Sequence, residues 1–314
     1  MPRSTALPHP LTQQMPAHGP VRCLWRADAA LGEGALWSAR EQALYWVDIL
    51  GQQLMRWSPA RQQQRQWRFE QPLSAVAERV SAPGLLLALG QGVYTWDPAC
   101  AHQPPRLLCA LDEPASNRCN DGHCDAQGRF WLGTMDFDAQ APTGALYCIE
   151  STGPGQAQAQ RRAHGYAVVN GPTWLSDRHT LLFNDTVQGR VLACDVAPET
   201  GALGPAHEWW RSTEGEGLPD GMCTDEAGRV WIAHWDGACV SCHEPAHGRL
   251  LGRIRLPVQR VTSCAFGGED LCTLYITTAR TGLSAAELAA QPLAGALFSV
   301  RLSQAGRLPH RYAG

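Results

Sequence analysis

The stretch "DAQGRFWLGTM", residues Asp125 to Met135, returns one hundred residues later as "DEAGRVWIAHW", residues Asp225 to Trp235. Both copies read D-x-x-G-R-x-W, in which a polar turn precedes an apolar, strand-like run. Two copies of one pattern indicate an internal repeat whose period is one hundred residues or a divisor of it.

Weaker copies of the pattern occupy the rest of the chain. Two are "WSAREQALYWVDI" from Trp37 and "WLSDRHTLLFNDT" from Trp174, and two more begin at Glu78 and Ala265. Together the copies define six units that start near residues 33, 75, 121, 170, 220 and 264. Each unit consists of short strand segments separated by turn signals, and repeats of about 40 to 50 residues with four strands are typical of propeller blades. The sequence therefore predicts an all-β fold, a six-bladed β-propeller with four antiparallel strands per blade.

Few segments fall outside this repeat. Residues 1–20 are polar and rich in proline, and we expect them to form a disordered N-terminal tail before a single propeller domain over residues 21–314. A strand near Val21 to Arg26 is expected to complete the last blade, and Leu283 to Gln291 to form a short helix or loop insertion. Five tryptophans are expected to pack between blades: Trp37, Trp46, Trp131, Trp231 and Trp235.

The amino-acid composition limits which binding partners and which chemistry the protein can have. With 44% hydrophobic residues, 18% charged residues and a net charge of -3, the chain resembles a globular protein and favours neither nucleic acid nor a membrane surface. No apolar run is long enough to span a bilayer. All 26 basic residues are arginine, which excludes Schiff-base lysines and a Walker A lysine. The N-terminus lacks the apolar segment of a secretory signal, so we expect a cytoplasmic protein whose twelve cysteines are reduced.

A C-x-x-C-H motif, "CVSCH" at Cys239 to His243, has the spacing that attaches a c-type haem. Haem attachment of this kind requires export, which the N-terminus does not indicate. A zinc site would need further ligands, and only His243 and His247 follow closely. We therefore interpret Cys239 and Cys242 as small apolar strand residues.

Four units carry an oxygen-bearing side chain followed by glycine at the same position of the repeat: Glu33-Gly34, Asp121-Gly122, Asn170-Gly171 and Asp220-Gly221. Equivalent positions of different blades are related by rotation about the central axis, so these side chains should converge at one end of the channel. Carboxylates brought together in this way repel one another unless they are protonated or neutralised by a cation.

A bound ion is the simpler interpretation of this convergence. The set Glu33, Asn170 and Asp220 offers only oxygen ligands, which suits Ca²⁺, Mg²⁺ or Mn²⁺, with Zn²⁺ also possible. The alternative is that E-G, N-G and D-G are ordinary turn dipeptides. Four such pairs in phase favour the ion.

The chain also resembles a known family. The resemblance rests on four motifs: "GEGALW" at Gly32 to Trp37, "NRCNDGHCDAQGRFWLGTM" at Asn117 to Met135, "NGPTWLSD" at Asn170 to Asp177, and "LPDGMCTDEAGRVWIAHWDG" at Leu218 to Gly237. They are similar to motifs of the gluconolactonase and regucalcin (senescence marker protein) family, six-bladed propellers that hydrolyse sugar lactones with one divalent metal ion. The resemblance implies metal ligands at Glu33, Asn170 and Asp220. It implies substrate contacts at Arg118 and Asn120, and it places a family glutamate at Asp138, one methylene shorter.

The chemistry of lactone opening agrees with these roles. A lactone is a cyclic ester, so hydrolysis needs an electrophile at the carbonyl oxygen and a hydroxide equivalent at carbon, and one divalent ion (Ca, Zn, Mn, Mg or Fe) can supply both. Arg118 offers fixed donors, while Asn120 can donate and accept. Asp220 is the candidate general base. Asp121, His123 and His234 are expected to support the inner strands, with a role next to the ligands or the substrate as the alternative.

Other functions have less support. No G-x-S-x-G elbow occurs, and "LGEGAL" and "LGQGVY" lack the third glycine of a dinucleotide site. A non-catalytic calcium-binding or scaffold propeller remains an alternative, as does a metal-dependent esterase or phosphotriesterase. We therefore expect an aldonolactone hydrolase of the gluconolactone, xylonolactone or arabinolactone type. Its partner would be a small sugar lactone, and the protein would be a monomer or a small homo-oligomer.

Overall fold

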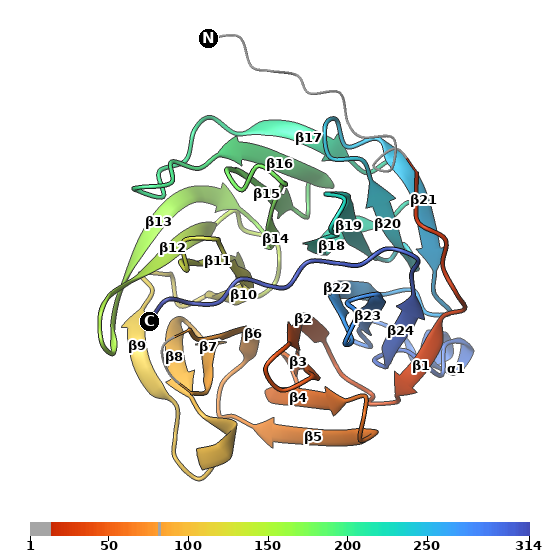
Figure 1. Ribbon diagram of the computed structural model, residues 1–314, viewed down its shortest axis with the longest axis horizontal. Helices are drawn as coiled ribbons and strands as arrows, with labels where there is room; N and C mark the ends of the chain where they lie inside the picture. The colour runs from red at the N-terminus through yellow and green to blue at the C-terminus, as the bar shows by residue number, and fades with distance from the viewer. Residues whose placement is uncertain (1–13, 81–82) are drawn as a thin grey trace.

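In the computed structural model, which describes residues 14–80 and 83–314, six four-stranded antiparallel sheets surround a central axis (Figure 1). Four strands per sheet and six sheets confirm the predicted six-bladed propeller. From the axis outward, each blade runs through its strands in chain order, except that the last blade takes its outermost strand from the N-terminus.

Strand bounds follow the repeat closely. The innermost strands are β2 (Gly32–Ser38), β6 (Leu73–Glu78), β10 (Asn117–Cys124), β14 (Val169–Trp174), β18 (Leu218–Thr224) and β22 (Val261–Gly267). The second strands are β3 (Ala43–Asp48), β7 (Leu85–Leu89), β11 (Phe130–Asp136), β15 (Thr180–Asp185), β19 (Val230–Trp235) and β23 (Thr273–Thr278). The third strands are β4 (Gln53–Ser58), β8 (Gly92–Trp96), β12 (Gly144–Gly153), β16 (Arg190–Asp195), β20 (Cys239–His243) and β24 (Leu297–Arg301). The outermost strands are β5 (Gln63–Arg68), β9 (Arg106–Ala110), β13 (Gln156–Tyr166), β17 (His207–Arg211), β21 (Leu250–Arg255) and β1 (Arg22–Trp25).

The ring is closed by pairing the two ends of the chain. β1 pairs with β24 at the outside of the sixth blade, as expected for a strand near residues 21–26. Of the expected tail, residues 1–13 lie outside the described part of the chain. Residues 14–20 differ from the expectation, because they lie on the propeller: Gly19 N donates to Arg301 O at 2.8 Å and Arg229 Nη1 donates to Gln14 O at 2.7 Å.

The D-x-x-G-R-x-W motif is a tight turn held by its aspartate. Between β10 and β11, one carboxylate oxygen of Asp125 accepts a hydrogen bond from the backbone N–H of Arg129, and the other accepts from Arg129 Nε at 2.6 Å and Trp131 Nε1 at 2.8 Å. Between β18 and β19, Asp225 makes the same three bonds to Arg229 and Trp231. The motif thus fixes the hairpin between the first two strands of a blade.

The core is a ring of apolar clusters between neighbouring blades. Trp231 of β19 meets Phe266 of β22 with their rings 5.7 Å apart, and Trp37 stacks on Tyr275 of the sixth blade at 5.7 Å. Of the five tryptophans expected to pack between blades, Trp37, Trp46, Trp131 and Trp231 are fully buried. Trp235, which ends its strand, is half-buried: it packs against the apolar cluster of the first and second blades and lies under the Arg260 guanidinium at 4.6 Å.

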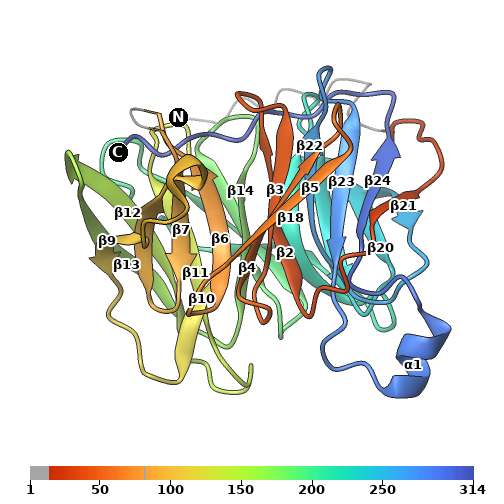
Figure 2. The same cartoon turned by 90° about the horizontal axis from the view of Figure 1, so that it is seen from below.

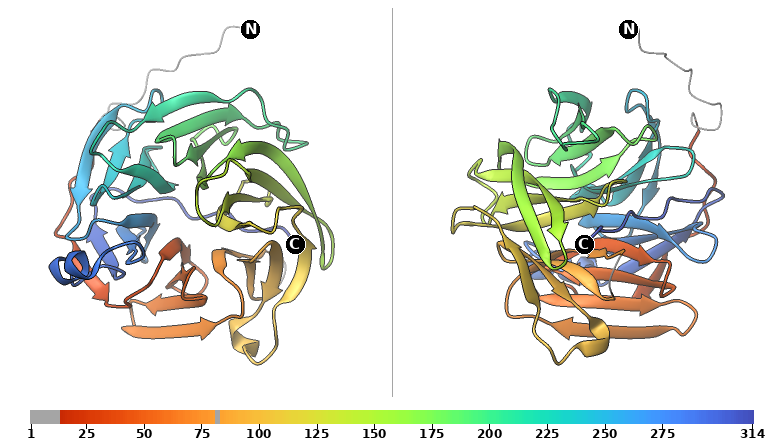
Figure 3. Two further views of the ribbon diagram at one scale, coloured as in Figure 1. Left: turned by 180° about the vertical axis from the view of Figure 1, so that it is seen from behind. Right: turned by 60° about the vertical axis from the view of Figure 1, so that its left-hand side comes forward.

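The channel has two structurally different ends. The innermost strands begin at one end, where the loop between β23 and β24 carries the short helix α1 (Ala285–Ala290), within the segment expected to be a helix or insertion. The other end is crossed by the C-terminal segment, residues 303–314, as Figure 2 shows from the side. In the left view of Figure 3 the same segment is seen through the central opening, behind the strands. No helix among the described residues is long and apolar enough to cross a membrane.

Candidate metal centre and active site

The four in-phase polar residues lie on four innermost strands, toward the channel end that carries α1. Glu33, Asn170 and Asp220 are near the start of their strands, and Asp121 is in the middle of β10. Glu33, Asp121, Asn170 and Asp220 are between 3% and 6% exposed. In each of the four strands the pairing with the next strand is interrupted by a bulge just after or around the polar residue. A bulge redirects side chains locally. Gly34 and Gly171 follow two of the residues with φ of 56° and 57°, a conformation that favours glycine.

The carboxyl groups of Glu33 and Asp220 are close enough to share a hydrogen bond when one is protonated. Burial, and after it the nearby carboxylate of Asp121, raise the pKa of Glu33 to about 8. Burial and the charge of Glu33 also hold the pKa of Asp220 well above its usual range. The Arg118 guanidinium lowers both pKa values, but by less than burial raises them; its own pKa falls to about 10 through burial, so it stays charged at neutral pH. The cluster therefore has an excess of negative charge that a proton or a cation must neutralise.

The donor set fits a hard divalent cation. Asp220 Oδ1 is buried and has no hydrogen-bond partner among the described residues, an arrangement that a bound ion would satisfy. Glu33, Asp220 and the amide oxygen of Asn170 supply oxygen ligands, as Ca²⁺, Mg²⁺ and Mn²⁺ prefer. Within residues 14–80 and 83–314, no group of three or more His, Cys, Asp and Glu side chains could hold a metal ion. The candidate centre has two carboxylates and an amide, so an ion here depends on the asparagine.

Asp121 supports the inner strands rather than facing the channel freely. Its Oδ1 accepts a hydrogen bond from Gly122 N at 2.8 Å, and its Oδ2 accepts from Gly171 N at 2.9 Å. The carboxylate therefore joins β10 to β14 through the two glycines of the in-phase pairs. This is the supporting role expected for Asp121.

The expected substrate residues, Arg118 and Asn120, belong to a row of side chains joined by hydrogen bonds, which continues through Asn170 to Thr186. Arg118 Nη1 donates to Asn120 Oδ1 at 2.8 Å, and Asn120 Nδ2 donates to Asn170 Oδ1 at 2.6 Å and to Val169 O at 3.0 Å. Both amide hydrogens of Asn120 are thus engaged, so the expectation that this residue donates to a polyol is not met in this arrangement. Arg118 Nε and Nη2 form no hydrogen bond within the described residues and are the donors left for a ligand.

Two residues of the second strand layer were missed by the sequence analysis. Asn170 Nδ2 donates to Thr186 Oγ1 at 3.2 Å, and Thr186 Oγ1 donates to Pro219 O at 2.9 Å. Asn184 Nδ2 donates to the backbone carbonyl of Asp220. The available signal was the polar "NDT" that ends a strand otherwise made of apolar residues, "TLLFND".

Three other expected residues lie apart from this row. Asp138 is exposed in the loop after β11, and within the described residues its carboxylate joins neither Arg118 nor Asn120. His123 Nδ1 donates to Pro172 O at 2.9 Å, which is a supporting contact. His234 is fully buried, and its Nε2 lies 2.7 Å from Ser241 Oγ.

The "CVSCH" motif forms β20, the third strand of the fifth blade, and every residue in it is buried. Burial raises the pKa of both the Cys239 and the Cys242 thiol. His243 donates from Nδ1 to Gly248 O at 2.8 Å, and its Nε2 lies 2.7 Å from Ser241 Oγ. These contacts occupy both nitrogens of His243 and favour the interpretation of the motif as a core strand.

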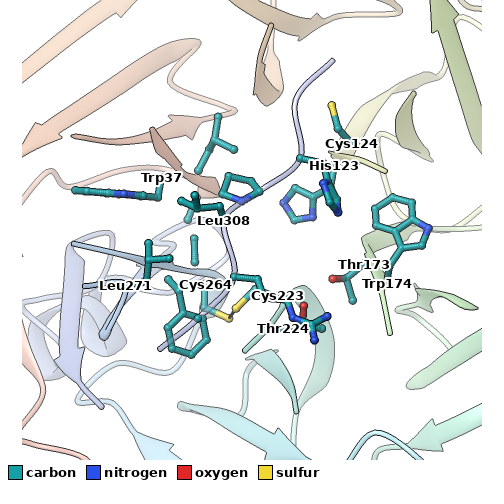
Figure 4. Close-up of a pocket in the computed structure, with 18 of the residues that line it drawn as sticks. Trp37, His123, Cys124, Thr173, Trp174, Cys223, Thr224, Cys264, Leu271 and Leu308 are labelled. Atoms are coloured by element: carbon teal, nitrogen blue, oxygen red, sulfur yellow. Dashed lines mark hydrogen bonds between the residues drawn. The ribbon is translucent and has the colours of Figure 1, made fainter. Parts of the chain in front are cut away.

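A cavity of about 500 Å³ occupies the opposite end of the channel, under the C-terminal segment (Figure 4). Trp37, His123, Trp174 and Leu308 line it, and Cys223 and Cys264 meet on its wall with their sulfurs 3.6 Å apart. None of the in-phase polar residues belongs to its lining. This cavity and the charged cluster therefore lie at different ends of the channel.

Comparison with known proteins agrees with this arrangement. The family model described as SMP-30/Gluconolactonase/LRE-like region matches residues 31–280. Regucalcin of Danio rerio is 33% identical over 297 residues, covering 94% of this chain and 98% of the relative. The Bacillus subtilis protein YvrE, provisionally named a sugar lactone lactonase, is 32% identical over 290 residues, covering 91% and 96%. The crystal structure of Agrobacterium tumefaciens regucalcin, described as a calcium-binding protein, superposes with a TM-score of 0.87 at 26% identity, covering 94% of this chain and 98% of that one.

Proposed function

Since the chain belongs to the family of SMP-30, gluconolactonase and LRE-like proteins, we propose that it is a divalent-metal-dependent lactonase that hydrolyses sugar lactones to aldonic acids. One observation carries this proposal. A buried pair of carboxyl groups, Glu33 and Asp220, lies at the channel end where Asn170 is also buried, and Asp220 Oδ1 lacks a partner among the described residues.

The ion would be held by Glu33, Asn170 and Asp220. A bound divalent ion supplies Lewis acidity toward a carbonyl oxygen and lowers the pKa of water. The residues of the chain do the rest. Asp220 can accept a proton from a water molecule that attacks the ester carbon, through the carboxylate oxygen that does not hold the ion. Asn170 Oδ1 has two lone pairs, so it can accept the Asn120 hydrogen bond and bind the ion at once.

Arg118 would hold the sugar. Its Nε and Nη2 are donors without a partner in the described part of the chain, and a guanidinium presents them in a fixed plane to hydroxyl or carbonyl oxygens. Asn120 can contribute only a lone pair on Oδ1. A hydroxylated lactone of the gluconolactone, xylonolactone or arabinolactone type matches these groups better than an unsubstituted one. Asp138 lies outside the network, and we propose no contact for it.

A panel of lactones, assayed by release of acid, tests the proposal. The apoprotein should be reconstituted separately with Ca²⁺, Mg²⁺, Mn²⁺, Fe²⁺ and Zn²⁺, and we expect hydrolysis with at least one ion and none after chelation. If an ion binds but no lactone is opened, the family's calcium-binding description, given for the Agrobacterium relative, becomes the better one for this chain as well.

A further inference from the structure

We propose that Thr186 is a positioning residue that aims the amide oxygen of Asn170 into the channel, an inference that rests on the proposed function. Thr186 directly follows β15, on the blade that carries Asn170, and its side chain is buried with 7% exposure. Its hydroxyl stands between the Asn170 amide and the next blade.

The argument follows the direction of the hydrogen bonds. The row begins at Arg118, whose guanidinium can only donate, and ends at Pro219 O, a backbone carbonyl that can only accept. With both ends fixed, every group between them has one possible orientation. Asn120 accepts through Oδ1 and donates through Nδ2, and Asn170 does the same.

The Thr186 hydroxyl is the last side-chain group of this row and follows Asn170, the proposed ligand. Because its single hydrogen is given to Pro219 O, at 2.9 Å, its oxygen can only accept from Asn170. Asn170 must therefore turn Nδ2 toward Thr186 and Oδ1 away from it, toward Asn120 and the channel. An amide flipped the other way would place two N–H donors where the proposed ligand oxygen belongs.

Removal of the hydroxyl should release this constraint. In Thr186→Val the Asn170 Nδ2 group and Pro219 O would both lose a partner in a buried place, and the amide would be held only by the Asn120 hydrogen bond to its Oδ1. Hydrogen bonds to metal ligands from neighbouring groups typically change metal affinity by about 10- to 100-fold. Thr186→Ser keeps the hydroxyl and should keep the affinity.

A matched control is available in the third blade. Thr134 is fully buried, and its hydroxyl also acts in both directions, accepting from Ala145 N at 2.8 Å and donating to Ala145 O at 3.3 Å. Both partners lie on the neighbouring strand β12, away from Asn170. Thr134→Val therefore imposes the same chemical change and a similar loss of stability without touching the row.

The experiment is a titration of each apoprotein with Mn²⁺, in which free Mn²⁺ is measured by electron paramagnetic resonance, with circular dichroism as a check of folding. We expect Thr186→Val to bind Mn²⁺ at least tenfold more weakly than the wild type, and Thr186→Ser and Thr134→Val to bind within threefold of it. Lactone hydrolysis by Thr186→Val should recover at saturating Mn²⁺, which loss of a reacting group would not allow. Thr186→Ala serves as the second variant if the valine does not fold.

The outcomes separate the two proposals. Wild-type affinity in folded Thr186→Val and Thr186→Ala would overturn the positioning role and leave the metal-dependent lactonase intact. An equal loss of affinity in Thr134→Val would also overturn it, since the effect would then be general destabilisation. If the wild type binds no Mn²⁺ or any other ion of the panel, the proposed function itself fails, and the role of Thr186 fails with it.

Discussion

Asn120 Nδ2 donates to Asn170 Oδ1 across 2.6 Å, and this one hydrogen bond joins the residue expected beside the sugar to a residue expected to bind the ion. The bond also connects the third blade to the fourth, because Asn120 lies on β10 and Asn170 on β14. Substrate and ion would therefore share one rigid set of groups. The predictions below follow from this arrangement and from the turns and buried histidines that hold it.

Removal of a ligand side chain should abolish catalysis. In Asp220→Ala or Asn170→Ala the proposed electrophile loses part of its coordination, so lactone hydrolysis should fall by orders of magnitude and bound metal should fall with it. Elemental analysis and the acid-release assay measure both quantities. The double variant Cys239→Ser with Cys242→Ser is the control, since both thiols lie in the core of the fifth blade, and it should hydrolyse at nearly the wild-type rate. Full activity in Asp220→Ala would refute the assignment of the metal site.

Arg118→Ala should separate substrate binding from metal binding. The guanidinium offers charge-assisted hydrogen bonds, each worth about 1.5 to 3 kcal/mol, so kcat/KM for a sugar lactone should fall by roughly ten- to a hundredfold while one ion per chain is retained. The loss should be smaller on a lactone without hydroxyl groups. Unchanged kcat/KM on both lactones, together with loss of metal, would mean that Arg118 supports the centre and does not hold the sugar.

The buried histidines of the fifth blade predict a loss of stability in acid. Burial lowers the pKa of both His234 and His243 from 6.5 to about 4, so between these values the unfolded chain binds more protons than the folded one. The free energy of unfolding should therefore fall as the pH drops from about 6.5 toward 4, by on the order of 3 kcal/mol for one imidazole. Urea unfolding at a series of pH values measures the slope. His243→Gln should flatten it, and an unaltered slope in that variant would show that other groups are responsible.

The turn aspartates should be required for stability and not for chemistry. Asp125 is 1% exposed and pairs with the buried Arg129, and loss of one partner of a buried ion pair typically costs about 3 to 5 kcal/mol. Asp125→Ala should lower the free energy of unfolding by this order, and Asp225→Ala should do the same in the fifth blade. Denaturant unfolding provides the measurement. Asp177→Ala, at an exposed turn of the fourth blade, is the matched control and should cost much less.

The repeat made the fold and the inner ring of the site predictable. Glu33, Asp121, Asn170 and Asp220 share a phase in the sequence, and rotation about the propeller axis brings residues in phase to one end of the channel. The same argument could not find Thr186 or Asn184, because they lie at the end of a second strand. Their approach to the first strand depends on the bulge between Asn170 and Thr173, which no residue pattern specifies.

Which groups donate and which accept hydrogen bonds could not be predicted from the sequence either. An asparagine in isolation can donate and accept, and only the neighbours Val169 and Asn170 show that Asn120 has no hydrogen left for a ligand. Residues 14–20 illustrate the same limit. Their polar, proline-rich composition indicates a tail, yet they lie along the outer surface because backbone groups of Arg301 and Ser303 provide partners.

The C-terminal segment that crosses the channel makes one short stretch of chain depend on most of the ring. Its residues bond to five blades, through Leu271 of the sixth, Glu226 of the fifth, Ser176 of the fourth, Gly128 of the third and Glu78 of the second. Residues 303–314 can make all of these contacts only when all five blades are folded, just as β1 needs β24 as its partner. The segment therefore ties the ring together across the channel.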